Sequence, residues 1–307
     1  AASIQNSHDA ITSEDPTATG TVWETKRVVI GQFGNVGATI PLRGPGGDDP
    51  PAANTWPQGK VLQAGGFAEI RLAAAVTADV QDGCTTTALE LANTESATDD
   101  FLLGAPITNA DIGTGFKATT IIAGYNGTTK MATLAETLGD APADTDEYTI
   151  PKHLRYVLGT LTTAPPILSI SVWRDKKRYN YRDYRPNSIA FNIPVGNEAN
   201  TSYPDFTFAG KGLIESVEAE DAPVVPSSIL AVNVPAAQNG KFFLDKVLMG
   251  HQSYSFTASY TIGAQSNQNQ PTGQDGYDIL SGTRAVALDL NQSDTSTFDL
   301  DTRVEDQ

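Results

Sequence analysis

Residues 169–210 read SISVWRDKKRYNYRDYRPNSIAFNIPVGNEANTSYPDFTFAG, and this stretch decides the fold. Apolar and polar residues alternate along residues 168–172, and the side chains of a strand point to opposite faces in turn. The alternation returns at 179–182, 188–193 and 206–208. We therefore predict four antiparallel strands in series. Their polar sides are rich in Ser, Asn, Thr and Arg, which predicts that one sheet face meets water or lines a wet space.

Length and composition favour one large β domain or two smaller ones. The chain has 307 residues, of which 39% are hydrophobic, with 27 Gly and 18 Pro. This composition suits many short strands joined by turns, so we predict an all-β fold. No apolar run approaches the roughly 20 residues that span a bilayer, and residues 1–16 lack the basic and apolar regions of a signal peptide. We expect a soluble, unexported protein.

The first 81 residues contain three predicted features. Residues 1–20 are polar, and we expect an arm that needs another segment or subunit to order it. Residues 43–57, RGPGGDDPPAANTWP, must form a loop, and its length suggests an exposed contact surface. Residues 60–75 are predicted to form a strand followed by a short helical turn.

Residues 82–151 combine acidic and small residues, and we interpret them as a small β domain inserted into the main one and facing outward. Asn126-Gly127 is a strong signal for a two-residue hairpin turn. Short strands are predicted at residues 101–104, at 113–119 and within 121–133, where Asn126-Gly127 would form the turn. In the alternative interpretation these strands belong to the main sheet.

The remainder of the chain is also predicted to be strands, apart from one or two helical turns at residues 211–221 that Pro223 and Pro226 would end. Tyr254, Phe256, Ala258 and Tyr260 share one face of a strand with a period of two. The predicted strands cover residues 148–151, 156–159, 228–234, 241–248, 253–262 and 283–290.

The formal net charge of −16 is distributed unevenly. Residues 82–151 carry −9 and residues 198–307 carry −10, whereas residues 152–197 carry +6. An acidic surface repels nucleic acid, so we expect no sequence-specific DNA binding. The basic run 174–185, which contains three tyrosines, would suit single-stranded nucleic acid. Because Asp175 and Asp183 interrupt the run, we favour pairing with an acidic neighbour.

We find no convincing catalytic or metal site in the sequence. Cys84 is the only cysteine, which excludes an intrachain disulfide, and we expect it to be a small buried or half-buried residue. His8, His153 and His251 lack the spacing of metal ligands. Two acidic clusters suit calcium chemically but do not match a calcium-loop pattern, so we favour solvated surface. They comprise Asp140, Asp144, Asp146 and Glu147, and Asp289, Asp294, Asp299 and Asp301.

Several short motifs together resemble the major tail tube proteins of long-tailed bacteriophages. They are a tyrosine-rich hairpin, Pro186-Asn187-Ser188-Ile189-Ala190-Phe191, a turn at 195–198, Phe206-Thr207-Phe208-Ala209-Gly210, Phe242-Phe243-Leu244, Ser253-Tyr254-Ser255-Phe256 and Gly282-Thr283-Arg284-Ala285-Val286. The resemblance covers roughly half of the chain well. The sequence departs from it at Asp183-Tyr184 and Pro186, where many relatives have Gly and a small residue. Residues 113–133 also resemble a small β module of phage virion proteins.

The resemblance implies a β-sandwich or barrel fold that contributes strands to the closed inner barrel of a hexameric ring. Residues 1–81 would hold the arm and the first part of the tube domain, residues 82–151 the exterior insertion and residues 152–307 the main part. The rings would stack into a virion tail, assembled in the host cytoplasm, through which double-stranded DNA passes without specific binding. Tape-measure, tail terminator and baseplate proteins would be further partners. The implied role is structural, with no enzymatic activity, cofactor, metal or membrane insertion.

Two loops, 43–57 and 265–278, are our candidates for ring-to-ring contacts. The positive zone of residues 152–197 and the negative zone of residues 198–307 are expected to meet across subunits or rings. The candidate interface residues are Arg43, Asp48, Arg174, Lys176, Lys177, Arg178, Tyr179, Tyr181, Arg182, Asn187, Gln274 and Asp275.

Two other classes of function stay open in the sequence. In a carbohydrate-binding or adhesin module, the aromatics Trp23, Trp56, Tyr125 and Tyr277 would be exposed and would stack on sugars. A tail-borne glycan hydrolase would need paired carboxylates facing a groove, and sequence order alone does not bring two acids together.

Overall fold

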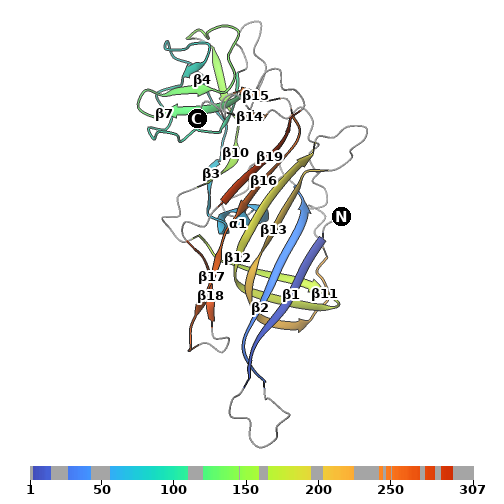
Figure 1. Ribbon diagram of the computed structural model, residues 1–307. Helices are drawn as coiled ribbons and strands as arrows, with labels where there is room; N and C mark the ends of the chain where they lie inside the picture. The colour runs from blue at the N-terminus through green and yellow to red at the C-terminus, as the bar shows by residue number, and fades with distance from the viewer. Residues whose placement is uncertain are drawn as a thin grey trace, which may run out of the picture.

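The structure is a computed structural model (Figure 1), and the all-β prediction is confirmed. Strands dominate the described residues, which contain one helix, α1 (Pro57–Ala64). The strands form a curled half-barrel sheet, a separate smaller sheet and three two-stranded pairs. The structure describes residues 3–14, 27–42, 56–109, 120–144, 146–158, 165–194, 203–224, 242–244, 247–249, 251–269, 274–280 and 285–292.

The curled sheet has the strand order β1-β2-β13-β12-β16-β19, and β11 pairs with β12 off this path. Each neighbouring pair is antiparallel. Figure 1 shows long strands that wrap around a common axis. The strand bounds are β1 (Ser3–Glu14), β2 (Arg27–Pro41), β11 (Leu168–Arg174), β12 (Lys177–Pro194), β13 (Asp205–Ala219), β16 (His251–Ser259) and β19 (Ala285–Gln292).

β12 is the central strand of this sheet. Along one edge it pairs with β13. Its other edge is divided, because β11 pairs with its first half and β16 pairs with residues 188–194. Register shifts between Arg182 and Ser188 separate the halves, and Asp183 has φ 53°. The two strands predicted at 179–182 and 188–193 are therefore one bulged strand, since bulges bend a strand without ending it.

β13 replaces the helical turns predicted at residues 211–221. It continues to Ala219 because its last residues pair with the first half of β12, from Leu213 opposite Arg182 to Ala219 opposite Lys177. Pairing with a neighbouring strand thus outweighs a local helical preference.

β1 corrects another prediction. The arm expected at residues 1–20 is a strand over residues 3–14, and it pairs with β2 of the same chain from Ser3 opposite Thr39 to Glu14 opposite Arg27. The chain itself supplies the ordering partner.

One face of the curled sheet is covered by α1 and by β3 (Phe67–Leu72), which pairs with β10 (His153–Leu158). Pro57 lies in the first turn of α1, where proline is tolerated because its missing N–H would have no helical partner. Gly66 follows the helix with φ 87°. The order predicted for residues 60–75 is therefore reversed: the helix comes first and the strand second. The core here comprises Val61, Leu62, Phe67, Ile189, Phe206, Ala258, Tyr260 and Ile279.

A second sheet, with the order β4-β9-β6-β7-β8-β5, lies at one end of the molecule (Figure 1). In the described residues its strands pair only with one another, and they enclose a core of their own that includes Leu89, Ile107, Ile122 and Tyr148. These strands are not part of the curled sheet. Their bounds are β4 (Val76–Asp79), β5 (Ala88–Glu90), β6 (Pro106–Asn109), β7 (Thr120–Asn126), β8 (Met131–Leu134) and β9 (Glu147–Ile150).

The predicted turns of this smaller sheet need two corrections. Residues 101–104 form turns instead of a strand. Asn126 and Met131 are paired, so the β7–β8 hairpin has a loop of residues 127–130 and no two-residue Asn-Gly turn. The left-handed residue of this loop is Lys130, with φ 58°.

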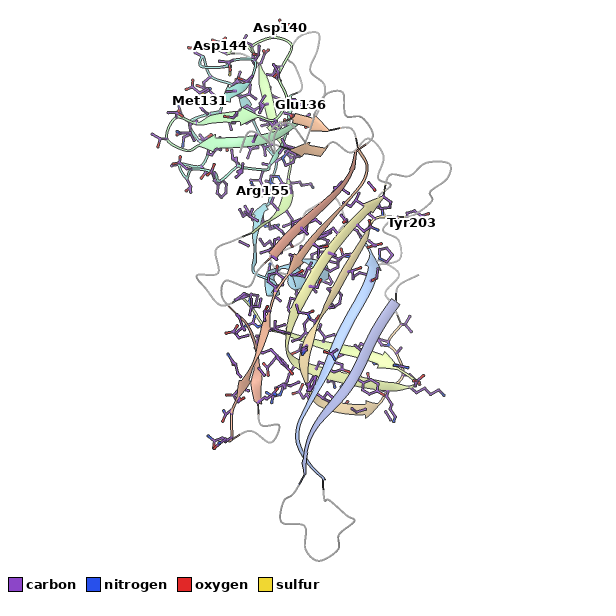
Figure 2. All side chains as sticks on the ribbon, viewed as in Figure 1. Met131, Glu136, Asp140, Asp144, Arg155 and Tyr203 are labelled. Carbon is purple, nitrogen blue, oxygen red and sulfur yellow. The ribbon has the colours of Figure 1, made fainter. Side chains whose placement is uncertain are left out.

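Arg155 in β10 joins the smaller sheet to the β3–β10 pair (Figure 2). Its guanidinium donates to the carbonyl oxygen of Phe101 at 2.5 Å and to that of Leu103. Both carbonyls belong to the turn at 101–104, so one side chain fixes this turn against the connecting strand.

The remaining predicted strands are largely confirmed. Residues 148–151 and 156–159 overlap β9 and β10, and 283–290 overlaps β19. Residues 241–248 split into the paired strands β14 (Phe242–Leu244) and β15 (Val247–Met249). Residues 253–262 form most of β16 and the start of the hairpin β17 (Ile262–Ser266) and β18 (Gln274–Ile279). The strands predicted at 113–119 and 228–234 lie outside the described residues.

Candidate functional site: the polar face and open edges of the curled sheet

The curled sheet carries small residues on one face, many of them Ser and Thr. Directly opposed residues of neighbouring strands share a face, so the register defines rows that cross the sheet. Each such residue is half-buried or exposed where its side chain is described. We name this the polar face; its central row is Thr39, Thr207, Ala190, Thr257 and Ala287, and a flanking row contains Gly37, Ala209, Ser188, Ser259 and Ala285.

The opposite face of the same strands is apolar. Phe206 and Phe191 have ring centroids 5.1 Å apart, and Phe191 and Phe256 have centroids 6.3 Å apart. Phe206 is fully buried. This apolar face packs on α1 and β3, which leaves the polar face to solvent. One row of the apolar face contains Ile40, Phe206, Phe191, Phe256 and Leu288.

The two rows combine the hydroxyl groups of Ser and Thr with the small residues Ala and Gly, and they contain no charged residue. The hydroxyls of Thr39 and Thr207 are hydrogen-bonded at 2.9 Å. The amide of Asn192 is 3.5 Å from the carboxylate of Asp205. The Lys211 ammonium lies 5.5 Å from the centroid of the Phe33 ring, a cation–π contact that keeps this lysine along the sheet.

The two outer strands of the sheet path are open in the described part of the chain. There, β1 pairs only with β2 and β19 pairs only with β16. The path contains an even number of antiparallel strands, so β1 and β19 run in opposite directions. Unpaired backbone N–H and C=O groups along such edges are templates for pairing with another chain.

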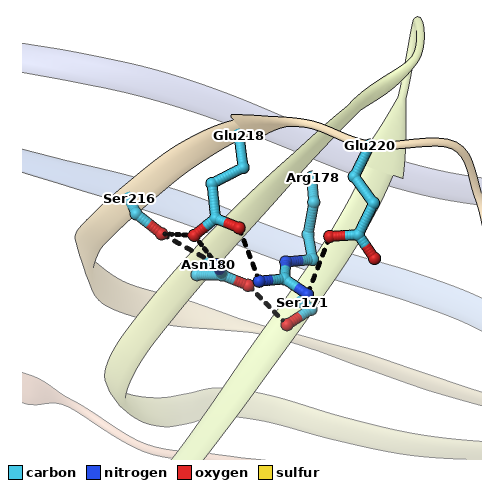
Figure 3. Close-up of polar contacts among 6 residues, drawn as sticks. All are labelled: Ser171, Arg178, Asn180, Ser216, Glu218 and Glu220. Carbon is cyan, nitrogen blue, oxygen red and sulfur yellow. Dashed lines mark hydrogen bonds and ion pairs between the residues drawn. The ribbon is translucent and has the colours of Figure 1, made fainter.

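A polar network covers the corner where β11, β12 and β13 bend away (Figure 3). The Ser171 hydroxyl donates to Asn180 at 2.7 Å, and the Asn180 amide donates to the Ser216 hydroxyl at 2.8 Å. Arg178 forms ion pairs with Glu218 at 2.7 Å and with Glu220 at 2.8 Å. Arg178, a candidate interface residue, therefore has its acidic partners within the chain.

Three of the four other basic candidates of this region lie at the β11–β12 turn. Asp175 and Lys176 have φ of 52° and 59°, which defines a tight two-residue hairpin turn. Arg174, Lys176 and Lys177 are exposed there, and Arg174 lies 3.3 Å from the carboxylate of Asp175. The side chains of this turn are exposed to solvent.

The tyrosine and amide candidates on β12 are less accessible. Tyr181 is 1% exposed and packs with Val172 and Tyr184 in the chain's own core. Tyr179 and Asn187 are half-buried. The guanidinium of Arg182 pairs with the carboxylate of its neighbour Asp183 at 3.1 Å.

Two further candidates lie on the β17–β18 hairpin, which projects from the curled sheet (Figure 1). Asp275 is exposed and accepts a hydrogen bond from the Asn267 amide at 2.7 Å, which links the two strands. Gln274 is half-buried at the start of β18. Arg43 and Asp48 lie outside the described residues.

Sequence reasoning missed Arg185, which anchors this hairpin. Arg185 is 5% exposed at the bulge of β12. Its Nε donates to the carbonyl oxygen of Tyr277 at 3.2 Å, and Nη1 donates to the carbonyl oxygens of Pro165 and, at 2.9 Å, Pro166. Nη2 lies 3.7 Å from the Asp278 carboxylate. Burial lowers the pKa of the guanidinium, and the charge of Asp278 opposes that shift.

The described acidic residues do not form a metal centre. No group of three His, Cys, Asp or Glu side chains in the described ranges is placed to hold a metal ion. Figure 2 shows Asp140 and Asp144 at the outer end of the smaller sheet, and both are exposed. The carboxylate of Asp146 accepts the N–H of Ala143 at 2.8 Å. Of the second cluster, Asp289 lies in β19 and the others lie outside the described residues.

The cysteine and the described histidine side chain have structural surroundings. Cys84 is half-buried, as predicted, and its sulfur accepts the N–H of Glu90 at 3.3 Å. Burial raises the pKa of this thiol, which keeps it protonated and unreactive. His153 is half-buried with Nδ1 2.6 Å from the carbonyl oxygen of Pro151, and burial lowers its pKa.

The three described aromatics proposed for sugar stacking are buried or half-buried. Tyr125 is 4% exposed and Tyr277 is 7% exposed, and Trp56 packs against Tyr156 with ring centroids 5.6 Å apart. The ring of Tyr125 belongs to the core of the smaller sheet, and the ring of Trp56 packs against the core of the curled sheet. Trp23 lies outside the described residues.

No helix in the described part of the chain has the length and apolar character needed to cross a membrane. The chain matches no protein-family model and no curated protein sequence. The features that bear on its function are therefore the two faces of the curled sheet and its open edges.

Proposed function

We propose that the protein is a structural subunit of a bacteriophage tail tube, in which hexameric rings stack to form the channel for DNA ejection. The observation that carries this proposal is a curled, two-faced sheet whose open edges, β1 and β19, run in opposite directions. The sequence motifs of residues 186–191 and 206–210 lie on the central strands of this sheet.

Opposite edge directions allow identical copies to join without breaking the antiparallel pattern. When β19 of one copy meets β1 of the next, the two strands are antiparallel, like every neighbouring pair inside the subunit. Repeating this contact closes a barrel and removes all edges, which would otherwise favour aggregation. The curl of each sheet supplies the curvature of the ring.

The polar face provides a suitable lining for the channel. Affinity for nucleic acid comes mainly from contacts of lysine and arginine with phosphate. Lys211 on β13 is held over the ring of Phe33, and Asp205 on the same strand adds a negative charge. A lining of hydroxyl groups and small side chains would offer few contacts that hold the phosphates of DNA.

Other parts of the chain would supply the contacts between successive rings. The projecting β17–β18 hairpin and the loop 43–57 would contact the next ring, a head-to-tail arrangement that gives an open filament. The smaller sheet would lie outside the tube. Tape-measure, terminator and baseplate proteins would complete the tail.

Electron microscopy of the purified protein at high concentration tests the proposal. Hollow tubes or six-fold rings support it, whereas a stable closed dimer that never forms rings contradicts it. Ala287→Pro on β19 should abolish rings, because proline cannot donate a ladder hydrogen bond. Ser169→Pro is the matched control on β11. Ser169 is exposed at a register shift, outside the paired residues, so proline there should leave rings intact.

Each variant is first compared with the original protein by circular dichroism and urea unfolding, so that loss of rings is not confused with loss of fold. Rings formed equally well by the Ala287→Pro protein would overturn the assignment of β19 to the subunit contact.

A further inference from the structure

The β7–β8 hairpin contains an Asn-Gly pair of which Asn126 is exposed and Gly127 is buried. Asn126 is exposed, and its side-chain oxygen accepts the N–H groups of Thr128 at 2.9 Å and Thr129 at 3.0 Å. The N–H of Gly127 donates to the carboxylate of Asp99 at 2.8 Å. Both reacting groups of an Asn-Gly pair are therefore held by hydrogen bonds.

Asn-Gly pairs can modify themselves with water as the only co-reactant. The backbone nitrogen of Gly127 loses its proton and attacks the side-chain carbon Cγ of Asn126. A new N–C bond forms, the Cγ–Nδ2 bond breaks, and the nitrogen leaves as ammonia. Water then opens the five-membered imide to aspartate or isoaspartate. Glycine favours the attack because it has no Cβ beside the nucleophilic nitrogen.

We propose that Asn126 is a deamidation site and that Asp99 suppresses the reaction in the folded protein. The attacking nitrogen must first give up its hydrogen, which is bonded to the Asp99 carboxylate. An amide anion beside a carboxylate is disfavoured, because like charges repel. The same hydrogen bond fixes the peptide plane, so the nitrogen is not free to rotate toward Cγ.

Neighbouring contacts reinforce this protection by fixing the loop that carries Asp99. The Tyr125 hydroxyl donates to the carbonyl oxygen of Ser96 at 2.6 Å, and the Lys130 ammonium donates to the carbonyl oxygens of Glu95 at 2.9 Å and Ser96 at 3.1 Å. Asp99 therefore stays in place as long as the hairpin and the loop remain packed together.

Deamidation would prevent this packing from forming again. A Cβ at Gly127 would lie 2.4 Å from the backbone of Ala97, so Gly127 packs tightly against the loop that carries Asp99. Isoaspartate at position 126 lengthens the backbone by one atom and would displace Gly127 from this close contact. The new negative charge at residue 126 would also lie next to the Gly127 N–H that Asp99 accepts, and like charges repel. A single opening of the hairpin would thus become permanent once Asn126 reacts. This chemistry is independent of the proposed assembly.

Peptide mapping by mass spectrometry, after incubation at mildly alkaline pH, measures the conversion of Asn126. We expect at least about tenfold slower conversion in the folded protein than in the urea-unfolded protein, the factor for about 1.4 kcal/mol of protection. Equal rates in the two states would overturn the proposal. This comparison needs no variant and is therefore unaffected by folding defects.

Asp99→Ala should accelerate conversion in the folded state, since Gly127 loses its acceptor. Asp99→Asn, which retains a neutral acceptor oxygen, should give an intermediate rate. Asp100→Asn is the matched control: it removes the adjacent exposed carboxylate, while the Asp100 backbone N–H still donates to Tyr125. If both Asp99 variants, shown by circular dichroism to be folded, react as slowly as this control, Asp99 is not the protecting residue.

Discussion

Arg185 donates its Nε hydrogen to the carbonyl oxygen of Tyr277, 3.2 Å away, and so joins the bulge of β12 to β18. The same guanidinium bonds Pro165 and Pro166 ahead of β11. One buried cation therefore positions the hairpin that we assign to contacts between rings.

Arg185→Met removes these donors and retains much of the apolar stem. Carbonyl groups that lose a donor in a buried setting cost about 1–3 kcal/mol each, so the free energy of unfolding should fall by at least about 2 kcal/mol in urea titrations. Arg174→Met is the control, because that side chain is 62% exposed, and a change within about 0.5 kcal/mol is expected. Similar losses in both variants would refute the anchoring role.

Phe206→Ala and Thr207→Ala compare the two faces of one strand. Phe206 is fully buried in the core, and its truncation should cost about 3–5 kcal/mol of unfolding free energy. Thr207 loses a half-exposed hydroxyl bond to Thr39, worth about 0.5–1.5 kcal/mol. Thermal or urea unfolding measures both values. An equal cost would mean that the assignment of the faces is wrong.

Alkaline pH should destabilise the fold through Tyr184. The Tyr184 hydroxyl donates to the carbonyl oxygen of Val36. Burial raises the pKa of Tyr184 in the folded protein above its value in the unfolded chain, which is about 10. The contribution of Tyr184 to the free energy of unfolding is therefore complete below pH about 10, and it is lost as the pH rises through the folded pKa. Tyr184→Phe should flatten the dependence of unfolding free energy on pH in that range. Tyr148 and Tyr156, whose pKa values are also raised, would maintain a residual slope.

Mild acid should destabilise the folded protein through protonation of His153. Burial lowers the pKa of its imidazole in the folded protein below the unfolded value of about 6.5, and the charge of Arg155 adds to this shift. The contribution of His153 to the free energy of unfolding is therefore complete above pH about 6.5, and it is lost as the pH falls through the folded pKa. His153→Asn retains a donor for Pro151 but does not titrate. Urea unfolding between pH about 7.5 and 5.5 should show a smaller loss for this variant, and equal losses would exclude His153 as the source.

The strands of residues 168–210 could be predicted because alternation reports directly which side chains meet the core. The same signal located Tyr254, Phe256, Ala258 and Tyr260 on one face. It did not show that residues 179–193 form one strand, since Asp183, Arg185 and Pro186 break the alternation within a bulge. Nor did it show that residues 211–219 are extended, because partners on β12, far away in sequence, decide that.

The site was less predictable than the fold. A basic run such as residues 174–185 does not reveal which side chains point inward, so buried Arg185 and exposed Lys177 were indistinguishable. The acidic partners of Arg178 lie about 40 residues further along the chain, and only the pairing of β12 with β13 brings them together. Tyr125 and Tyr277 likewise gave no local sign of burial.

β12 is paired along both of its edges, and ladder hydrogen bonds lie across the strand direction. A force along β12 therefore loads many of these bonds at once, in shear. A force at right angles, applied at a strand end, opens them one after another. The sheet is thus an anisotropic material, stiff along its strands and compliant across them.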